Sequence, residues 1–320
     1  MVATYREEPC RSALNRVTGM PFGWSLNPYM GCAHRCTFCY VRGFEKRADR
    51  PWDDRYGTSI RVKTNVVEVL RRELGRRSWK GEGVVIGAAT DPYQPAEGRF
   101  RLTRGCIEAL AAARNPLSII TRGPLIVRDT DVLTEASRRA AVSINISIPT
   151  LDQRIWRATE PGTAPPRQRL RALTRLVDAG IDVGVGMAPI LPGLSDRPEL
   201  LADVVRAARD AGATSIWTAL LNLRPGTREH FLAGLARDWP ELLPRYERLY
   251  AGRAYLGSAE VEPVRREVAE LRDRFAVGDR RRVRILPVPR PAADVQLDLA
   301  SLGFGEPAPA AVAGPASRIA

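Results

Sequence analysis

The sequence predicts an α/β protein in which parallel strands alternate with helices and form a curved or barrel-like sheet. From Trp24 onward, apolar strand-like runs alternate with helix-like runs, which is typical of βα repeats. Two strands, at residues 142–148 and 181–188, carry bulky residues at every second position and small or polar residues between them. A parallel strand buried on both faces would be apolar throughout, so one face of this sheet has room for a ligand. The alternative is an antiparallel sheet with one solvated face.

Six strands are expected. The first leads up to Asn27, and the others lie at residues 83–89, 116–121, 142–148, 181–190 and 214–220. The clearest helix is expected at residues 65–77, where Asn65 can cap the first turn and an apolar stripe is formed by Val66, Val69, Leu70 and Leu74. Chemistry is expected at the carboxyl ends of the strands.

The chain is expected to divide into four segments. They are an N-terminal extension at residues 1–20, a barrel at residues 21–255, a helical basic extension at residues 256–285 and a Pro- and Ala-rich tail at residues 286–320 that is largely disordered. The basic extension has a charged helix at residues 261–275, followed by a run of arginines at 280, 281, 282 and 284.

The charge of the chain points to an anionic partner. The 320 residues include 49 Lys and Arg against 36 Asp and Glu, a net charge of +13. Residues 1–180 hold 30 basic and 18 acidic residues, so most of the surplus lies there. It predicts either a groove for nucleic acid or a docking face for an acidic electron donor, with a generic solvated surface as the third possibility.

The location expected for the chain is cytoplasmic. No window has the apolar length of a membrane span, and the first residues are charged where a secretory signal would be apolar. No membrane contact is expected.

The five cysteines stand at positions 10, 32, 36, 39 and 106, and three of them fall within eight residues. This is the spacing of a metal site in a reducing compartment. Three thiolates can bind three irons of a 4Fe-4S cluster and leave the fourth iron open, as a catalytic centre requires. The alternative is a structural zinc bound by the three cysteines and His34.

The run Asn27-Pro-Tyr-Met-Gly-Cys32-x3-Cys36-x2-Cys39-Tyr40 resembles the signature of the radical S-adenosylmethionine (SAM) enzymes. The chain looks most like the branch of mostly uncharacterised, DNA-repair-photolyase-like proteins that contains spore photoproduct lyase. The resemblance runs from about residue 25 to residue 225. Its other motifs are Val62-Lys63-x-Asn65, Thr90-Asp91-Pro-Tyr-Gln-Pro-x-Glu97, Arg128-Asp129, Glu160-Pro161 and Ala188-Pro-Ile-x-Pro192-Gly193.

The resemblance implies a partial (β/α)6 TIM-like barrel with parallel strands. It also implies a 4Fe-4S cluster on Cys32, Cys36 and Cys39, at which SAM is reductively cleaved. The resulting 5′-deoxyadenosyl radical would abstract hydrogen from a substrate that the sequence does not identify. The alternatives are a nucleic-acid repair or modification enzyme related to the lyase, and a non-catalytic iron-sulfur or zinc protein.

The resemblance also places contacts to SAM at the strand ends, although each residue has an alternative role as scaffold. The contacts are Tyr40 beside the adenine, Thr90 and Asp91 at the methionine amino end, Arg122 at the carboxylate, Ser147 at the ribose, and Met187 and Ile190 in an apolar wall against the adenine.

One position departs from the lyase pattern. Ala88 stands where spore photoproduct lyase has its hydrogen-donor cysteine, so photoproduct repair by that route is not expected. Cys106 lies in a helical pattern among apolar residues and is expected to be buried, and Cys10 is expected to be incidental.

Two protein partners are predicted. A flavodoxin- or ferredoxin-type donor would reduce the cluster. In the tail, Gln296-Leu-Asp-Leu299 resembles the first four residues of the bacterial sliding-clamp-binding pentapeptide, with Ala300 in place of the terminal aromatic. The alternative for the tail is a short element that docks on the body of the protein.

Overall fold

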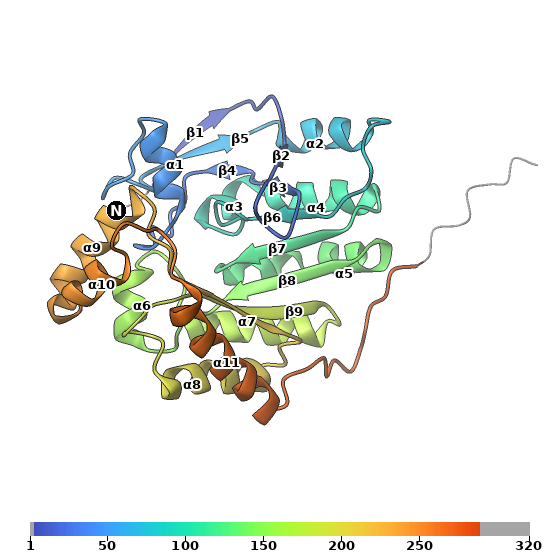
Figure 1. Cartoon of the computed structure of the whole chain (residues 1–320). Helices are drawn as coiled ribbons and strands as arrows, with labels where there is room; N and C mark the ends of the chain where they lie inside the picture. The colour runs from blue at the N-terminus through green and yellow to red at the C-terminus, as the bar shows by residue number, and fades with distance from the viewer. Residues whose placement is uncertain (1–2, 289–320) are drawn as a thin grey trace, which may run out of the picture. The chain divides into compact units, whose positions relative to one another are not determined.

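The main sheet has seven strands in the order β10-β9-β8-β7-β6-β3-β2, and six of them run parallel (Figure 1). The computed structural model describes residues 3–288. Within them the parallel strands are β3 (Trp24–Leu26), β6 (Val84–Ile86), β7 (Leu117–Thr121), β8 (Val142–Ser147), β9 (Asp182–Ile190) and β10 (Ile216–Leu220). The predicted parallel α/β fold is therefore confirmed, and the antiparallel alternative is wrong for these strands.

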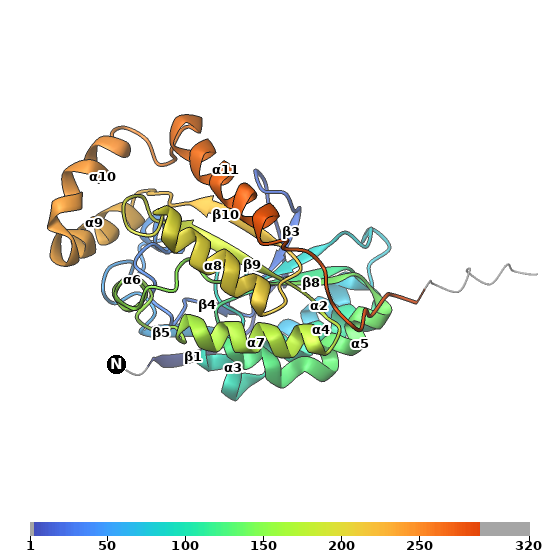
Figure 2. The same ribbon diagram turned by 90° about the horizontal axis from the view of Figure 1, so that it is seen from below.

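Helices follow the strands and cover the outer face of the sheet, as Figure 2 shows for α7 and α8. The helices are α1 (Val41–Arg47), α2 (Val66–Leu74), α3 (Pro95–Phe100), α4 (Leu102–Ala112), α5 (Thr130–Arg139), α6 (Gln153–Thr159), α7 (Pro166–Asp178), α8 (Pro198–Asp210), α9 (Thr227–Asp238), α10 (Leu243–Leu249) and α11 (Ser258–Arg274), with 3-10 turns at Pro124–Asp129 and Pro240–Leu242.

The alternation along β9 separates a packed face from an open face. Val183, Val185 and Met187 are fully buried in the core that the sheet forms with the helices. Gly184 and Gly186 lie on the other face, where the side chains of Ser215 and Trp217 lie against them. The small residues of the alternating pattern therefore make room on the inner face, as expected.

Two strands come from the N-terminal residues, in which the sequence shows no periodicity. β1 (Thr4–Glu8) pairs in parallel with β5 (Ser59–Lys63), and β4 (Tyr29–Met30) pairs antiparallel with β5 on its other side. β2 (Leu14–Arg16) pairs antiparallel with β3 and forms one edge of the main sheet. This segment is thus built into both sheets.

Helix α2 forms where the apolar stripe predicts it, but Asn65 does not cap it as expected. The Asn65 side chain makes no capping hydrogen bond. Its Oδ1 accepts from the backbone N–H of Cys10 at 2.7 Å, and its Nδ2 donates to the Cys10 carbonyl at 3.2 Å. The physical reason is that β1 runs beside β5 and brings Cys10 next to Asn65, where the backbone of Cys10 takes both polar atoms of the amide.

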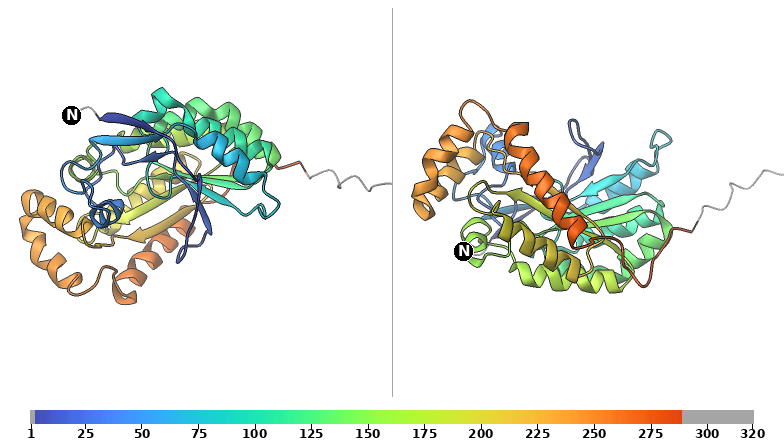
Figure 3. Two further views of the ribbon diagram at one scale, coloured as in Figure 1. Left: turned by 90° about the horizontal axis from the view of Figure 1, so that it is seen from above. Right: turned by 60° about the horizontal axis from the view of Figure 1, so that its bottom comes forward.

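The predicted C-terminal helix is present as α11, which lies beside α8 (Figure 3, right). One compact unit spans Met1–Pro287, and the segment Val288–Ala320 is grouped separately. The division at residues 20, 255 and 285 stays a prediction, and the Gln296–Leu299 motif lies outside the described residues. Among the described helices, none has both the length and the apolar character needed to cross a membrane.

Candidate active site

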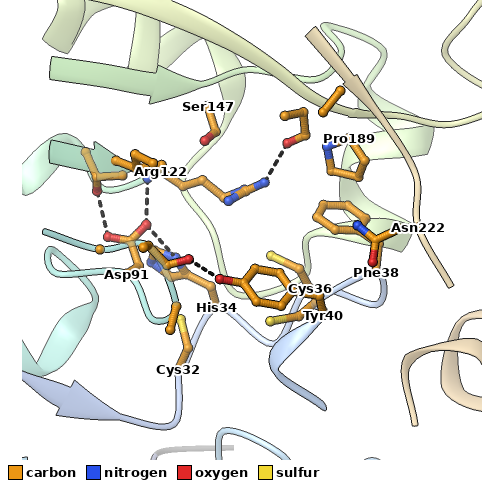
Figure 4. Close-up of a pocket in the computed structure, with 18 of the residues that line it drawn as sticks. Cys32, His34, Cys36, Phe38, Tyr40, Asp91, Arg122, Ser147, Pro189 and Asn222 are labelled. Carbon is orange, nitrogen blue, oxygen red and sulfur yellow. Dashed lines mark hydrogen bonds and ion pairs between the residues drawn. The ribbon is translucent and has the colours of Figure 1, made fainter. Parts of the chain in front are cut away.

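A cavity of about 270 Å³ lies at the carboxyl ends of the parallel strands (Figure 4). Five of the six parallel strands contribute a residue at or just beyond the strand end: Ala88 after β6, Arg122 after β7, Ser147 at the end of β8, Ala188 near the end of β9 and Leu220 at the end of β10. The remaining walls come from the hairpin between β2 and β3 and from the loop between β4 and α1. Chemistry is therefore possible at the end of the sheet where the sequence predicts it.

The loop between β4 and α1 brings three thiols to one wall of this cavity. Cys32, Cys36 and Cys39 all line it, and each is a free cysteine. Gln94, fully buried, holds the loop with both ends of its amide: its Oε1 accepts from the Ala33 N–H at 2.9 Å, and its Nε2 donates to the Gly31 carbonyl at 3.1 Å. The loop is therefore fixed before any ligand binds.

Two glycines let other segments approach the cysteine loop closely. Gly57 has a φ of +78°, and a Cβ there would overlap the carbonyl oxygen of Cys32. At Gly162 a Cβ would overlap the carbonyl oxygen of Ala33. Both contacts confine the backbone around Cys32.

Arg42, in the first turn of α1, links the cysteine loop to the backbone of Trp52 and Asp53 through hydrogen bonds. It is 1% exposed and donates to the carbonyls of Trp52 and Asp53 at 2.6 Å and, more weakly, to the carbonyl of Cys36 at 3.4 Å. Its guanidinium lies 4.7 Å from the ring centroid of Tyr56, whose hydroxyl is 3.7 Å from the sulfur of Cys39. A buried cation thus stands beside two of the three thiols.

Burial raises the pKa of Cys36 and of Cys39 above that of an ordinary thiol. Both are thus protonated at neutral pH in the structure as it stands. Metal binding would have to displace these protons, as it does at other thiolate sites.

Asp91 and His34 form a buried ion pair at the cavity wall, with Nδ1 of His34 3.2 Å from Oδ2 of Asp91. Asp91 also accepts hydrogen bonds at 2.6 Å from the Thr121 hydroxyl and the Arg122 N–H. Burial acts to raise the pKa of Asp91, but these partners lower it to about 2. Burial acts to lower the pKa of His34, but Asp91 and Cys32 raise it to about 10. Both groups are charged at neutral pH.

Arg122 crosses the cavity wall between two acceptors. Its Nε donates to Glu160 at 2.6 Å, and its Nη2 donates to the Ala188 carbonyl at 2.9 Å. Glu160 is 1% exposed and is shared with the fully buried Arg169, at 3.0 Å. Burial opposes the charge of Arg122, but Cys36 and Glu160 raise its pKa above that of a free guanidinium. The guanidinium therefore stays charged.

The donor set fits an iron-sulfur cluster better than a single metal ion. Within residues 3–288, no three Cys, His, Asp or Glu side chains are grouped closely enough to hold one ion. In a cluster each cysteine binds a different iron, so its ligands need not meet at one point. His34, the fourth ligand of the zinc alternative, is already paired with Asp91.

The structure brings most of the expected SAM contacts together. Tyr40, Asp91, Arg122 and Ser147 line the same cavity as the cysteines. The Tyr40 hydroxyl donates to the carbonyl of Ala88.

Three expected contacts do not line the cavity. Thr90 is buried, and its hydroxyl donates to the Tyr29 carbonyl at 2.7 Å. It therefore holds the backbone of β4 just before the cysteine loop. Met187 and Ile190 are fully buried in the core. Ala188 and Pro189 line the cavity in this region instead, because Met187 is on the packed face of β9 and the register between β9 and β10 shifts before Ile190.

Several lining residues were not expected from the sequence. Phe38 lies inside the cysteine loop, and its position between Cys36 and Cys39 is the feature of the sequence that could have indicated it. Asn222 follows β10, and its Oδ1 is buried without a hydrogen-bond partner in the described part of the chain. Trp217 lies on the inner face of β10, while Met20 and Phe22 come from the hairpin.

Comparisons with known proteins show which proteins this chain resembles. The family model of the Radical SAM superfamily matches residues 26–205. The uncharacterised protein Rv2578c of Mycobacterium tuberculosis is 42% identical over 283 residues, which cover 87% of this chain and 83% of that protein. The uncharacterised protein ORF301 of Acidianus two-tailed virus is 30% identical over 220 residues, which cover 65% of this chain and 70% of that protein.

Among solved structures, spore photoproduct lyase has a similar fold. Its complex with a dinucleoside spore photoproduct matches with a TM-score of 0.66 at 16% identity, over 86% of this chain and 81% of that chain. A variant of the lyase with bound AdoMet and the same photoproduct gives the same TM-score, identity and coverage. At this identity the likeness shows a shared fold.

Proposed function

The chain belongs to the radical SAM superfamily, and we propose that it binds a 4Fe-4S cluster through Cys32, Cys36 and Cys39 and reductively cleaves SAM in the adjoining cavity. The observation that carries the proposal is that three free thiols of one loop line a cavity at the carboxyl ends of the parallel strands. When bound and reduced, the cluster would supply the electron that divides SAM into methionine and a 5′-deoxyadenosyl radical.

The polar end of the cavity suits the methionine part of SAM. Asp91 is ionised and can attract the amino group, while Arg122 is charged and can attract the carboxylate. Glu160 and the Ala188 carbonyl already hold Arg122, so its guanidinium is oriented before SAM arrives.

The apolar end suits the adenine. Phe38, Pro189 and Leu221 give flat or aliphatic surface, and the unpartnered Oδ1 of Asn222 can accept a hydrogen bond from the exocyclic amine. Ser147 lies at the end of β8 and offers a hydroxyl for the ribose.

The substrate would enter beside Trp217, Met20 and Phe22. Met20 and Trp217 are large apolar side chains that are 56% and 40% exposed, and all three line the cavity. Exposed apolar groups at the mouth of a cavity favour contact with a ligand over contact with water. An apolar mouth also helps to exclude water from a reactive radical.

The test is anaerobic reconstitution of the full chain with iron and sulfide, followed by reduction with dithionite in the presence of SAM. The proposal predicts close to four irons per chain and the formation of 5′-deoxyadenosine and methionine in equal amounts. A reduced protein with four bound irons that released neither product would contradict it. In a cell, each cleavage would consume one electron from a flavodoxin- or ferredoxin-type donor.

A further inference from the structure

A second feature lies at the opposite end of the sheet from the cysteines. Five exposed cations stand within residues 71–80, which we name the 71–80 surface: Arg71, Arg72, Arg76, Arg77 and Lys80. The ion pairs of the described residues 3–288 include none made by these five side chains. The one acidic residue of the segment, Glu73, is buried.

The helix dipole stabilises only two of the five cations of this surface. Arg71 and Arg72 are in the last turn of α2, where the partial negative charge of the helix end stabilises cations. The helix ends at Leu74 and is followed by Gly75, so Arg76, Arg77 and Lys80 lie in the loop beyond it. Three uncompensated cations in one loop repel one another, and they gain most from an anionic ligand.

A cavity of about 180 Å³ opens beside these cations. Trp24 and Trp79 line it together with Arg76, Glu73, Leu14, Ser12 and Ser78. The two indoles are in edge contact, with ring centroids 5.2 Å apart. The wall therefore combines two aromatic rings with one cation, Arg76, and one carboxylate, Glu73.

Both indoles of this cavity are fixed through their edges. Trp24 donates its Nε1 hydrogen to Glu82 at 2.6 Å, and Trp79 donates to Asn115 at 2.8 Å. Arg16 lies 5.1 Å from the ring centroid of Trp24, so a cation already stacks on one of the rings.

The acidic residues at the cavity offset only part of the positive charge of the 71–80 surface, although one of them, Glu73, lines the cavity. The Glu73 carboxylate accepts from the Ser12 hydroxyl and from the backbone N–H groups of Ala13 and Leu14. Glu82 forms an ion pair with Arg16 at 3.5 Å. Glu68, one turn earlier on α2, is exposed and forms no ion pair with the five cations in the described part of the chain, so its charge offsets at most one of theirs.

We propose that the 71–80 surface and the Trp24–Trp79 cavity bind single-stranded nucleic acid, with phosphates on the arginines and a base against the indoles. An arginine can bind a phosphate while the neighbouring aromatic ring stacks on the adjacent base. A base can enter such a cavity only when it is not paired and stacked in a duplex, which favours a single strand. An acidic electron donor would have to approach the cysteines. This loop instead precedes β6, at the amino end of the parallel strands (Figure 1).

The test is fluorescence anisotropy of a labelled DNA single strand of about 12 nucleotides, titrated with the full chain at several salt concentrations. The variant Arg76→Gln/Arg77→Gln/Lys80→Gln should bind at least about tenfold more weakly, and its salt slope should fall by about 2, because each phosphate contact contributes about 0.7. Binding should also quench tryptophan fluorescence in the wild type.

The matched control is Arg265→Gln/Arg266→Gln/Arg274→Gln on α11, which removes the same charge from exposed positions. It should keep wild-type affinity. Equal weakening in both variants, no binding by the wild type, or displacement of the strand by polyglutamate at equal charge would overturn the proposal. Formation of 5′-deoxyadenosine should be the same in both variants, so failure of the proposed SAM cleavage would show in that assay and leave the binding result standing.

Discussion

The indole N–H of Trp217 donates a hydrogen bond to Oδ1 of Asn145 at 2.9 Å, across the intervening strand β9. The ring crosses β9 at Gly186, where a Cβ would lie only 2.9 to 3.1 Å from three atoms of the indole. Three neighbouring strands therefore fix one aromatic side chain at the cavity wall, while 40% of it stays exposed. A tryptophan held in this way presents a preformed surface to whatever enters the cavity.

Asn145→Ala should release this ring. We expect the free energy of unfolding to fall by about 1 kcal/mol, because the indole N–H loses its acceptor. Acrylamide quenching of Trp217, measured as the difference from Trp217→Phe, should increase. Asn222→Ala, in the same cavity, is the control and should leave the quenching of Trp217 unchanged. Equal quenching of Trp217 in the wild type, in Asn145→Ala and in Asn222→Ala would contradict the anchoring role of Asn145.

Cys36→Ala should abolish both iron binding and SAM cleavage, because a cluster with three ligands loses one of them. Iron content and 5′-deoxyadenosine after anaerobic reconstitution are the measurements. Cys106→Ala is the matched control, because Cys106 is fully buried in α4 and does not line the cavity. Loss of iron in both variants, or in neither, would argue against the assigned ligands.

Gly57→Ala should displace the cysteine loop. The φ of +78° is unfavourable for alanine, and its Cβ would overlap the Cys32 carbonyl, so we expect a loss of about 2 kcal/mol in stability. Iron content after reconstitution should also drop. Gly234→Ala in α9 meets no atom within 4 Å and should stabilise the protein by up to about 1 kcal/mol. Similar melting temperatures for the two variants would refute the close-packing argument.

Glu160→Gln should destabilise the protein by about 3 kcal/mol, because Arg122 and Arg169 both lose a buried counter-charge. Urea denaturation measures this loss. Glu135→Gln breaks an exposed ion pair of the same kind, with Arg139 at 2.6 Å, and should cost less than about 1 kcal/mol. The prediction fails if both substitutions cost the same.

The six parallel strands were predictable because burial dictates their composition. The alternation in β8 and β9 reports directly which side of the sheet is packed, and each of these strands is followed by a helix. β1 and β2 lacked such a signal. Most of the positions in these two strands are exposed or half-buried, because each strand lies at the edge of its sheet, so neither has a regular apolar pattern.

The site was predictable where residues are adjacent in sequence and less so where it depends on strand orientation. The three cysteines of one loop line one wall of the cavity, as their spacing predicts. Met187 was expected in the apolar wall, although the alternation of β9 places it with Val183 and Val185 on the packed face and leaves Ala188 facing the cavity. The role of Asn65 could not be predicted from the local sequence, because its hydrogen-bond partner Cys10 lies 55 residues away.

The cavity wall is assembled from residues far apart in the sequence, between Met20 and Asn222. Synthesis proceeds from the N-terminus, so the cysteine loop leaves the ribosome long before the wall formed by Trp217 and Asn222 exists. Until then the three thiols lack their final cover and are open to oxidation. Stable retention of the proposed cluster should therefore require the sixth parallel strand, and chains truncated before residue 216, reconstituted anaerobically, should lose bound iron faster on exposure to air than the full chain does.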